Sequence, residues 1–135
     1  MKFKISASAI LFALALAAVP AFAHHAVQAE FDFDKPIAVK GTIAKVEWIN
    51  PHSYLSLDVK GADGKVTRWA FELVGPGGLR KAGLSRDDRG GLKPGQEIAV
   101  SGFASKDGSN SGFAKDITLP DGRTVTIWSK DPYAK

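Results

Sequence analysis

The chain has 135 residues, with 18 Lys and Arg against 14 Asp and Glu, and a formal net charge of +4. This small basic excess is spread along the chain, which argues against nucleic-acid binding, because nucleic-acid-binding domains usually carry a clustered basic face. The chain contains no cysteine, which excludes disulfides, thiolate metal sites and cysteine nucleophiles, so a bound metal would need nitrogen and oxygen ligands.

The first 23 residues have the pattern of a signal peptide. Lys2 and Lys4 precede an uninterrupted apolar run at residues 9–19, and Ala21-Phe22-Ala23 matches the small-x-small pattern of a cleavage site. The apolar run is shorter than the roughly 20 residues that span a bilayer, which favours cleavage over a retained membrane anchor. We therefore expect a periplasmic or secreted protein without a transmembrane anchor, cleaved after Ala23 to leave 112 residues (135 − 23).

The remaining chain divides into three expected parts. Residues 24–36 have the composition of an extended N-terminal arm, in which Phe31 and Phe33 alternate with acidic residues and which Pro36 ends. This arm could also contain a short edge strand. Residues 37–128 are the length of one domain, and residues 129–135 are expected to be a flexible tail.

The first predicted strand of the domain, residues 37–49, changes phase along its length. Its apolar residues first occupy one face (Ile37, Val39, Ile43) and then the other (Val46, Trp48). A phase change within a strand indicates a bulge or a strong bend, which we expect at Ala44-Lys45 and which Gly41 nearby would suit.

Alternating apolar and polar residues predict further strands at residues 55–59, 66–74, 96–103, 113–119 and 124–128. One or two helical turns are expected at residues 79–82, where Gly83 would end the helix. This order is expected of a small Greek-key, OB-like barrel. We predict an all-β fold of five to six antiparallel strands with a short helical insert between strands three and four. A β-sandwich with a loop insert is the alternative.

The three histidines suggest a metal site. His24 and His25 would open the mature chain, and His52 follows the Asn50-Pro51 turn of the first hairpin. A free N-terminal histidine offers its α-amino and ring nitrogens to the same ion, and metal can displace the amine proton near neutral pH. Such nitrogen-rich ligands suit Cu(II) and Zn(II), with copper favoured by the usual order of affinities. In the competing interpretation the three histidines are incidental.

Five acidic residues could orient a metal-bound histidine: Glu30, Asp32, Asp34, Glu47 and Glu72. Aspartates that alternate with phenylalanines are more typical of a solvated strand face, and Glu72 beside Phe71 is more typical of a surface residue. No phosphate loop, nucleophile elbow or dinucleotide fingerprint occurs. We therefore assign no catalytic residue and expect a protein that is not an enzyme.

Aromatic residues on the strands suggest a second kind of ligand face. Trp48 and Tyr54, with Trp69 and Trp128, could bind a sugar or an apolar ligand, although aromatic residues at strand spacing more often belong to the core. In OB-like barrels the first hairpin loop and the loop between strands four and five flank the ligand face. These loops would be residues 50–53 and 106–111, which places His52 on that side.

Several motifs together resemble a known family. They are His24-His25, Ala29-Glu30-Phe31-Asp32, Val46-Glu47-Trp48, Asn50-Pro51-His52, Trp69-Ala70-Phe71-Glu72, Leu92-Lys93-Pro94-Gly95, Lys106-Asp107-Gly108-Ser109-Asn110 and Leu119-Pro120-Asp121-Gly122-Arg123. On these residues the chain resembles the exported bacterial domain of unknown function 6152 family. The resemblance implies a periplasmic β-barrel-like domain and brings no established activity. It also implies that the histidine pair and Asn-Pro-His belong to the family's pattern.

The sequence therefore suggests a periplasmic, non-enzymatic binding domain, with copper or zinc as the first candidate ligand, held by His24, His25 and His52. Two alternatives are a barrel that binds a protein or a small ligand, and an accessory domain of an envelope enzyme. The expected partner is an unknown small ligand or an envelope protein.

Overall fold

The computed structural model describes residues 27–86 and 91–128. Residues 27–30 form a helical turn in a first compact unit, Met1–Glu30, and all the described strands lie in the second unit, Phe31–Lys135. The expected signal peptide, His24, His25 and the expected tail at 129–135 lie outside the described residues. In the described part of the chain, no helix has the length and apolarity that a membrane crossing requires.

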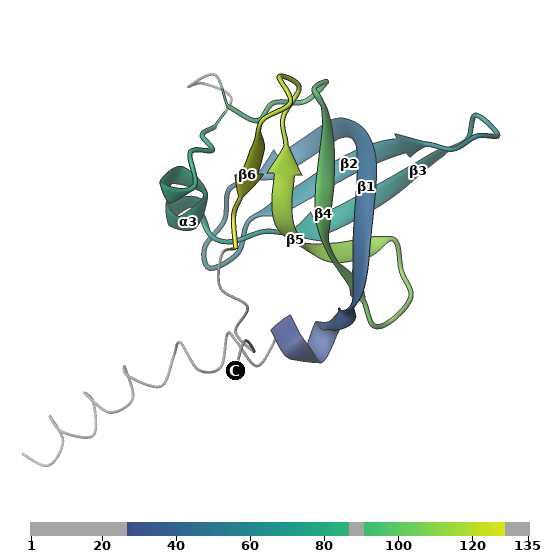
Figure 1. Cartoon of the computed structure of the whole chain (residues 1–135), viewed down its shortest axis with the longest axis horizontal. Helices are drawn as coiled ribbons and strands as arrows, with labels where there is room; N and C mark the ends of the chain where they lie inside the picture. Colours follow the sequence, from purple (N-terminus) through teal and green to yellow (C-terminus); the bar gives the residue numbers. More distant parts are fainter. Residues whose placement is uncertain (1–26, 87–90, 129–135) are drawn as a thin grey trace, which may run out of the picture. The chain divides into compact units, whose positions relative to one another are not determined.

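The second unit is built from six strands and a short helix within the described residues. They are β1 (Phe31–Glu47), β2 (Tyr54–Lys60), β3 (Val66–Glu72), α3 (Pro76–Lys81), β4 (Glu97–Ser105), β5 (Ser111–Thr118) and β6 (Thr124–Thr126). The sheet has the strand order β3-β2-β1-β4-β5-β6, and an additional pairing joins β3 to β5. Five strands therefore form a closed ring, and β6 continues the sheet from β5 (Figure 1).

This architecture confirms the all-β prediction, with six strands and a helical insert between strands three and four. A closed ring also rules out the sandwich alternative for the described residues. One pairing was not predicted: β3 and β5 run parallel, with Ala70 opposite Ser111. Alternating patterns indicate which residues face the core, but they do not indicate the direction of a neighbouring strand.

The long strand β1 contributes to both halves of the ring, pairing with β2 along its second half and with β4 along its first (Figure 1). In the β1–β2 pairing, Ile43 and Lys45 lie opposite consecutive residues of β2, so Ala44 is an extra residue. The predicted bulge is therefore confirmed. β1 also begins at Phe31, inside the segment that the sequence suggested to be an arm, and Pro36 is accommodated at a second register shift rather than ending the strand.

The core fills the ring with side chains from alternate positions of its strands. The largest fully buried members include Ile43, Leu55, Leu57, Phe71, Leu73, Ile98, Val100 and Ile117. Each buried aliphatic or aromatic side chain contributes about 1.5–3 kcal/mol to folding. Most outward-facing positions are polar or half-buried, as the alternation predicts, whereas Val66 is an exposed apolar residue.

The helix α3 is short and ends where the sequence predicts. Gly83 has φ +92°, and it donates its backbone N–H to Arg80 while Leu84 donates to Leu79. These two hydrogen bonds form a Schellman motif, which glycine favours because it adopts positive φ without strain. Leu79 and Leu84 are both buried in the core, so the helix and the turn after it are fixed to the ring.

Candidate functional site

His52 lies in the loop 48–53 between β1 and β2, and its neighbour Ser53 anchors that loop. Ser53 is fully buried. Its carbonyl accepts the N–H of Leu73 at 2.8 Å, and its own N–H donates to the carbonyl of Val74 at 3.4 Å. The β2–β3 pairing therefore continues past Tyr54, and the loop bearing His52 is fixed to the end of β3.

His52 is paired with Glu72, the last residue of β3. Its Nδ1 contacts Glu72 Oε1, and only 24% of the His52 side chain and 11% of the Glu72 side chain are exposed. A carboxylate accepts hydrogen bonds, so in the neutral imidazole Nδ1 is the nitrogen that carries the hydrogen and Nε2 presents its lone pair. Among the described residues, no hydrogen bond engages Nε2. The ring is thus held in one orientation with one nitrogen available as a ligand.

An aromatic cluster, which we define as Phe31, Phe33, Phe103, Phe113 and Trp128, borders this pair. Phe113 is its centre, with ring centroids 4.3 Å from Trp128 and 5.7 Å from Phe31. The His52 ring meets the Phe113 ring nearly perpendicularly, at 6.4 Å between centroids. Phe113 lies opposite Glu72 in the β3–β5 pairing. The cluster therefore forms an apolar wall beside the His52–Glu72 pair.

The two loops expected to flank a ligand face both adjoin β3. Loop 48–53 bonds to Leu73 and Val74, and the carbonyl of Asn110, in the loop between β4 and β5, accepts the N–H of Ala70 at 3.0 Å. His52 and this second loop thus border the same strand. Asp107 within the loop has its pKa lowered to about 2 by hydrogen bonds from the side chain and backbone of Ser109 and from the side chain of Ser105.

The aromatic residues suggested as a ligand face lie in different environments. Trp48 is partly buried against the core, and the guanidinium carbon of Arg86 lies 5.9 Å from its ring centroid. Tyr54 is 41% exposed at the start of β2. Trp69 packs against the core and stacks on Phe71, whereas Trp128 belongs to the aromatic cluster.

Of the three histidines proposed to hold a metal, the structure describes only His52, because His24 and His25 lie outside the described residues. Within those residues, no group of three or more His, Asp or Glu side chains is placed to hold a metal ion. Sequence reasoning raised Glu72 as a possible partner but favoured a surface residue, and it did not consider Phe113. The strand register could have indicated Glu72, since Tyr54 lies opposite it.

The comparisons with known proteins identify a family without an assigned activity. None of the curated proteins matches the sequence. A family model described as a family of unknown function, DUF6152, matches residues 12–114. This match covers more than half of the chain, and it confirms the resemblance drawn from the sequence motifs. The chain therefore belongs to the family of unknown function DUF6152.

Proposed function

We propose that this protein is an exported, non-enzymatic binding domain whose ligand is a divalent transition metal, with Cu(II) or Zn(II) as the candidates. The observation that carries the proposal is the His52–Glu72 pair. Metal-bound histidines almost always donate their other ring N–H to a carboxylate, a carbonyl or water, which fixes the tautomer and raises the basicity of the coordinating nitrogen. His52 has this partner before any metal is added.

The burial of Glu72 supports a positioning role. A glutamate at a strand end usually extends into solvent, but this side chain is only 11% exposed. Burying a carboxylate is unfavourable unless it is hydrogen-bonded, and the pairing with His52 contributes to that compensation. The aromatic wall beside the pair restricts the ring further. A pre-oriented imidazole loses less conformational entropy on binding an ion than a mobile one.

The remaining ligands in this proposal come from the start of the mature chain. Cleavage after Ala23 would give His24 a free α-amino group, which with its ring nitrogen makes a chelate, and His25 adds a further nitrogen. Four nitrogen ligands suit Cu(II) and Zn(II). This proposal depends on export and on cleavage at that position, and its test must therefore use an authentic His24 terminus.

The test is a calorimetric titration of Cu(II) and Zn(II) into the mature protein, residues 24–135. We expect one ion per chain. His52→Ala should remove a ligand and lower the affinity at least tenfold, and one alanine added before His24 should do the same. Glu72→Gln should weaken binding about 10- to 100-fold, the usual effect of losing a carboxylate partner of a ligating histidine.

Asp58→Asn is the matched control, because Asp58 is also a strand carboxylate with a side-chain partner, Arg68, at 2.8 Å. Its replacement removes the same charge from the neighbouring strand β2 and should leave the affinity unchanged. Equal affinities for the wild type, His52→Ala and the N-terminally extended protein would refute the proposal. Equal weakening by Asp58→Asn and Glu72→Gln would show that only net charge matters.

A further inference from the structure

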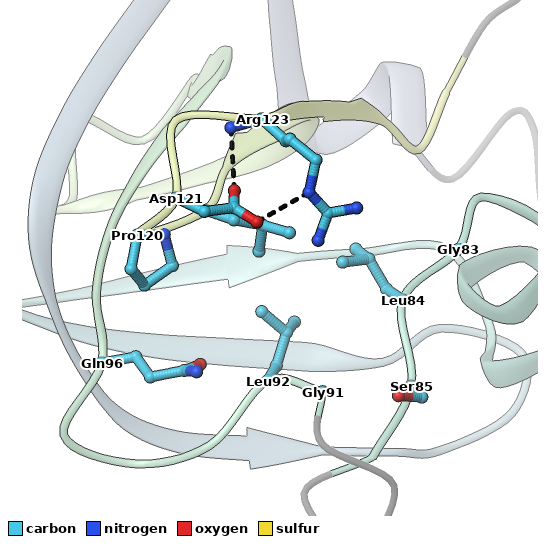
Figure 2. A pocket seen from close by; sticks show the side chains of 10 residues that line it. Gly83, Leu84, Ser85, Gly91, Leu92, Gln96, Pro120, Asp121 and Arg123 are labelled. Carbon is cyan, nitrogen blue, oxygen red and sulfur yellow. Dashed lines mark hydrogen bonds and ion pairs between the residues drawn. The ribbon is translucent and has the colours of Figure 1, made fainter.

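A cavity separate from the His52–Glu72 pair opens between the segment after α3 and the β5–β6 turn. Its volume is about 250 Å³ (Figure 2). The walls come from residues 83–85, from residues 91–96 and from residues 119–123. The first two segments are close together in the sequence, and Leu92 donates its N–H to the carbonyl of Ser85. The third segment follows β5 and reaches them through the pairing of the strands.

The apolar part of the cavity lining comes from leucine side chains. Leu84 is 3% exposed and Leu92 is 1% exposed, and both belong to the core cluster. Leu119 is partly buried and packs against the same cluster. A ligand group that covers these side chains would therefore be hydrocarbon, since a polar group there would lose its hydrogen bonds to water.

The rim carries an arginine that is paired with a neighbouring aspartate. Asp121 accepts the backbone N–H of Arg123 at 2.9 Å through one oxygen and the Nε–H at 2.7 Å through the other. These two bonds from Arg123 lower the pKa of Asp121, and the backbone bond has the larger effect. The carboxylate of Asp121 therefore stays ionised. Figure 2 shows the guanidinium extending from Asp121 toward Leu84, across the cavity.

Arg123 and Gln96 supply hydrogen-bond donors at the rim. Within the described residues no hydrogen bond uses the two terminal nitrogens of Arg123, whereas both oxygens of Asp121 are engaged. Gln96 accepts the N–H of Lys93 through Oε1 at 3.1 Å, which leaves its amide NH₂ as a donor. Terminal guanidinium nitrogens match the two oxygens of a carboxylate.

We propose that this cavity binds a small organic carboxylate with a short apolar tail, the carboxylate at Arg123 and the tail over Leu84 and Leu92. The volume of the cavity limits the length of the tail, because it lies below the volumes of about 300–1,000 Å³ that are usual for drug-sized ligands. A hydrocarbon chain of about six carbons, or one aromatic ring, is a tail of suitable size. The binding is weak and rapidly reversible, because Arg123 is largely exposed: 72% of its side chain is accessible.

The test is an NMR titration of metal-free protein with hexanoate, followed by backbone amide shifts. Acetate provides the charge without the tail, hexan-1-ol the tail without the charge, and hexylamine the tail with the opposite charge. We expect saturable shifts at Leu84, Leu92 and Arg123 with hexanoate, and at least tenfold weaker binding of the three comparison compounds.

Arg123→Gln should weaken hexanoate binding about five- to tenfold and leave the fold unchanged, since the side chain is exposed. Arg68→Gln is the matched control, because Arg68 makes the same kind of pair with Asp58 but does not line the cavity. His52→Ala should also have no effect, which separates this site from the proposed metal site. Hexanoate shifts that are absent or lie elsewhere, equal binding of hexylamine, or equal affinity of Arg123→Gln and Arg68→Gln would overturn the proposal.

Discussion

Replacing Gly102 with alanine should weaken the closure of the ring. Gly102 lies in β4 opposite Ala114 of β5, directly after a register shift in that pairing. A Cβ added there would lie 1.9 Å from the carbonyl oxygen of Phe113, well inside the 3.0 Å that real Cβ atoms keep from such neighbours. The obstacle is backbone of the paired strand, which cannot rotate aside as a side chain can.

The expected loss follows from this contact. Overpacking a core position typically costs about 1–3 kcal/mol, and occasionally more. Because β4 and β5 must separate to admit the methyl group, we expect about 3 kcal/mol for Gly102→Ala. At about 4 °C per kcal/mol for a domain of this size, the midpoint of thermal unfolding should fall by roughly 12 °C.

Gly77→Ala is the matched control for this experiment. Gly77 lies in α3, and a Cβ added there meets nothing within 4 Å. The substitution should raise the free energy of unfolding by about 0.4–1 kcal/mol, because alanine restricts the unfolded chain. Urea unfolding followed by tryptophan fluorescence measures both variants. If Gly102→Ala unfolds at the same urea concentration as the wild type, the placement of β4 against β5 is wrong.

Three further substitutions test other parts of the structure. Phe71→Ala should cost about 3–5 kcal/mol in urea unfolding, since Phe71 is fully buried and stacks on Trp69; a loss below about 1 kcal/mol would contradict that burial. Gly75→Ala should displace the loop that carries His52, because the added Cβ would lie 2.6 Å from the Pro51 carbonyl oxygen; retention of the wild-type His52 Nδ1–H resonance would count against this contact. Asp107, with its pKa lowered from 3.8 to about 2, should add stability that is fully present above pH 3.8 and is lost as the pH falls toward 2. Asp107→Asn should remove this contribution to the loss of stability in acid. An NMR titration in which the Asp107 carboxyl has its midpoint near 3.8 would disprove the lowered pKa.

Local signals in the sequence predicted much of the ring. The phase change between Ile43 and Val46 located the bulge at Ala44, because a strand that buries both faces in turn must shift its register. Gly83 likewise marked the end of the helix. The parallel β3–β5 pairing was not predicted, since it joins strands separated by the helix and by β4 and leaves no mark on either strand's alternation.

The pairing of His52 with Glu72 could have been predicted from the sequence. The Asp63-Gly64 turn sets the register of β2 on β3, which places Tyr54 opposite Glu72. Residues of the same face two positions along are diagonal neighbours within reach of long side chains, so His52 and Glu72 could have been paired from the register alone. The burial of Glu72 was not predictable in this way, because it depends on where loop 48–53 is anchored. The cavity at Arg123 was missed because its walls come from segments before β4 and after β5, which only the folded sheet brings together.

The central claim is that Glu72 holds His52 with Nε2 available to a metal ion. It is tested most directly by ¹⁵N NMR of the imidazole nitrogens in the mature protein, before and after one equivalent of Zn(II). We predict that metal-free His52 carries its hydrogen on Nδ1, that this tautomer is lost in Glu72→Gln, and that zinc shifts the Nε2 resonance in the wild type. A hydrogen on Nε2 in the metal-free protein, or an Nε2 resonance that zinc leaves unmoved, would contradict the account.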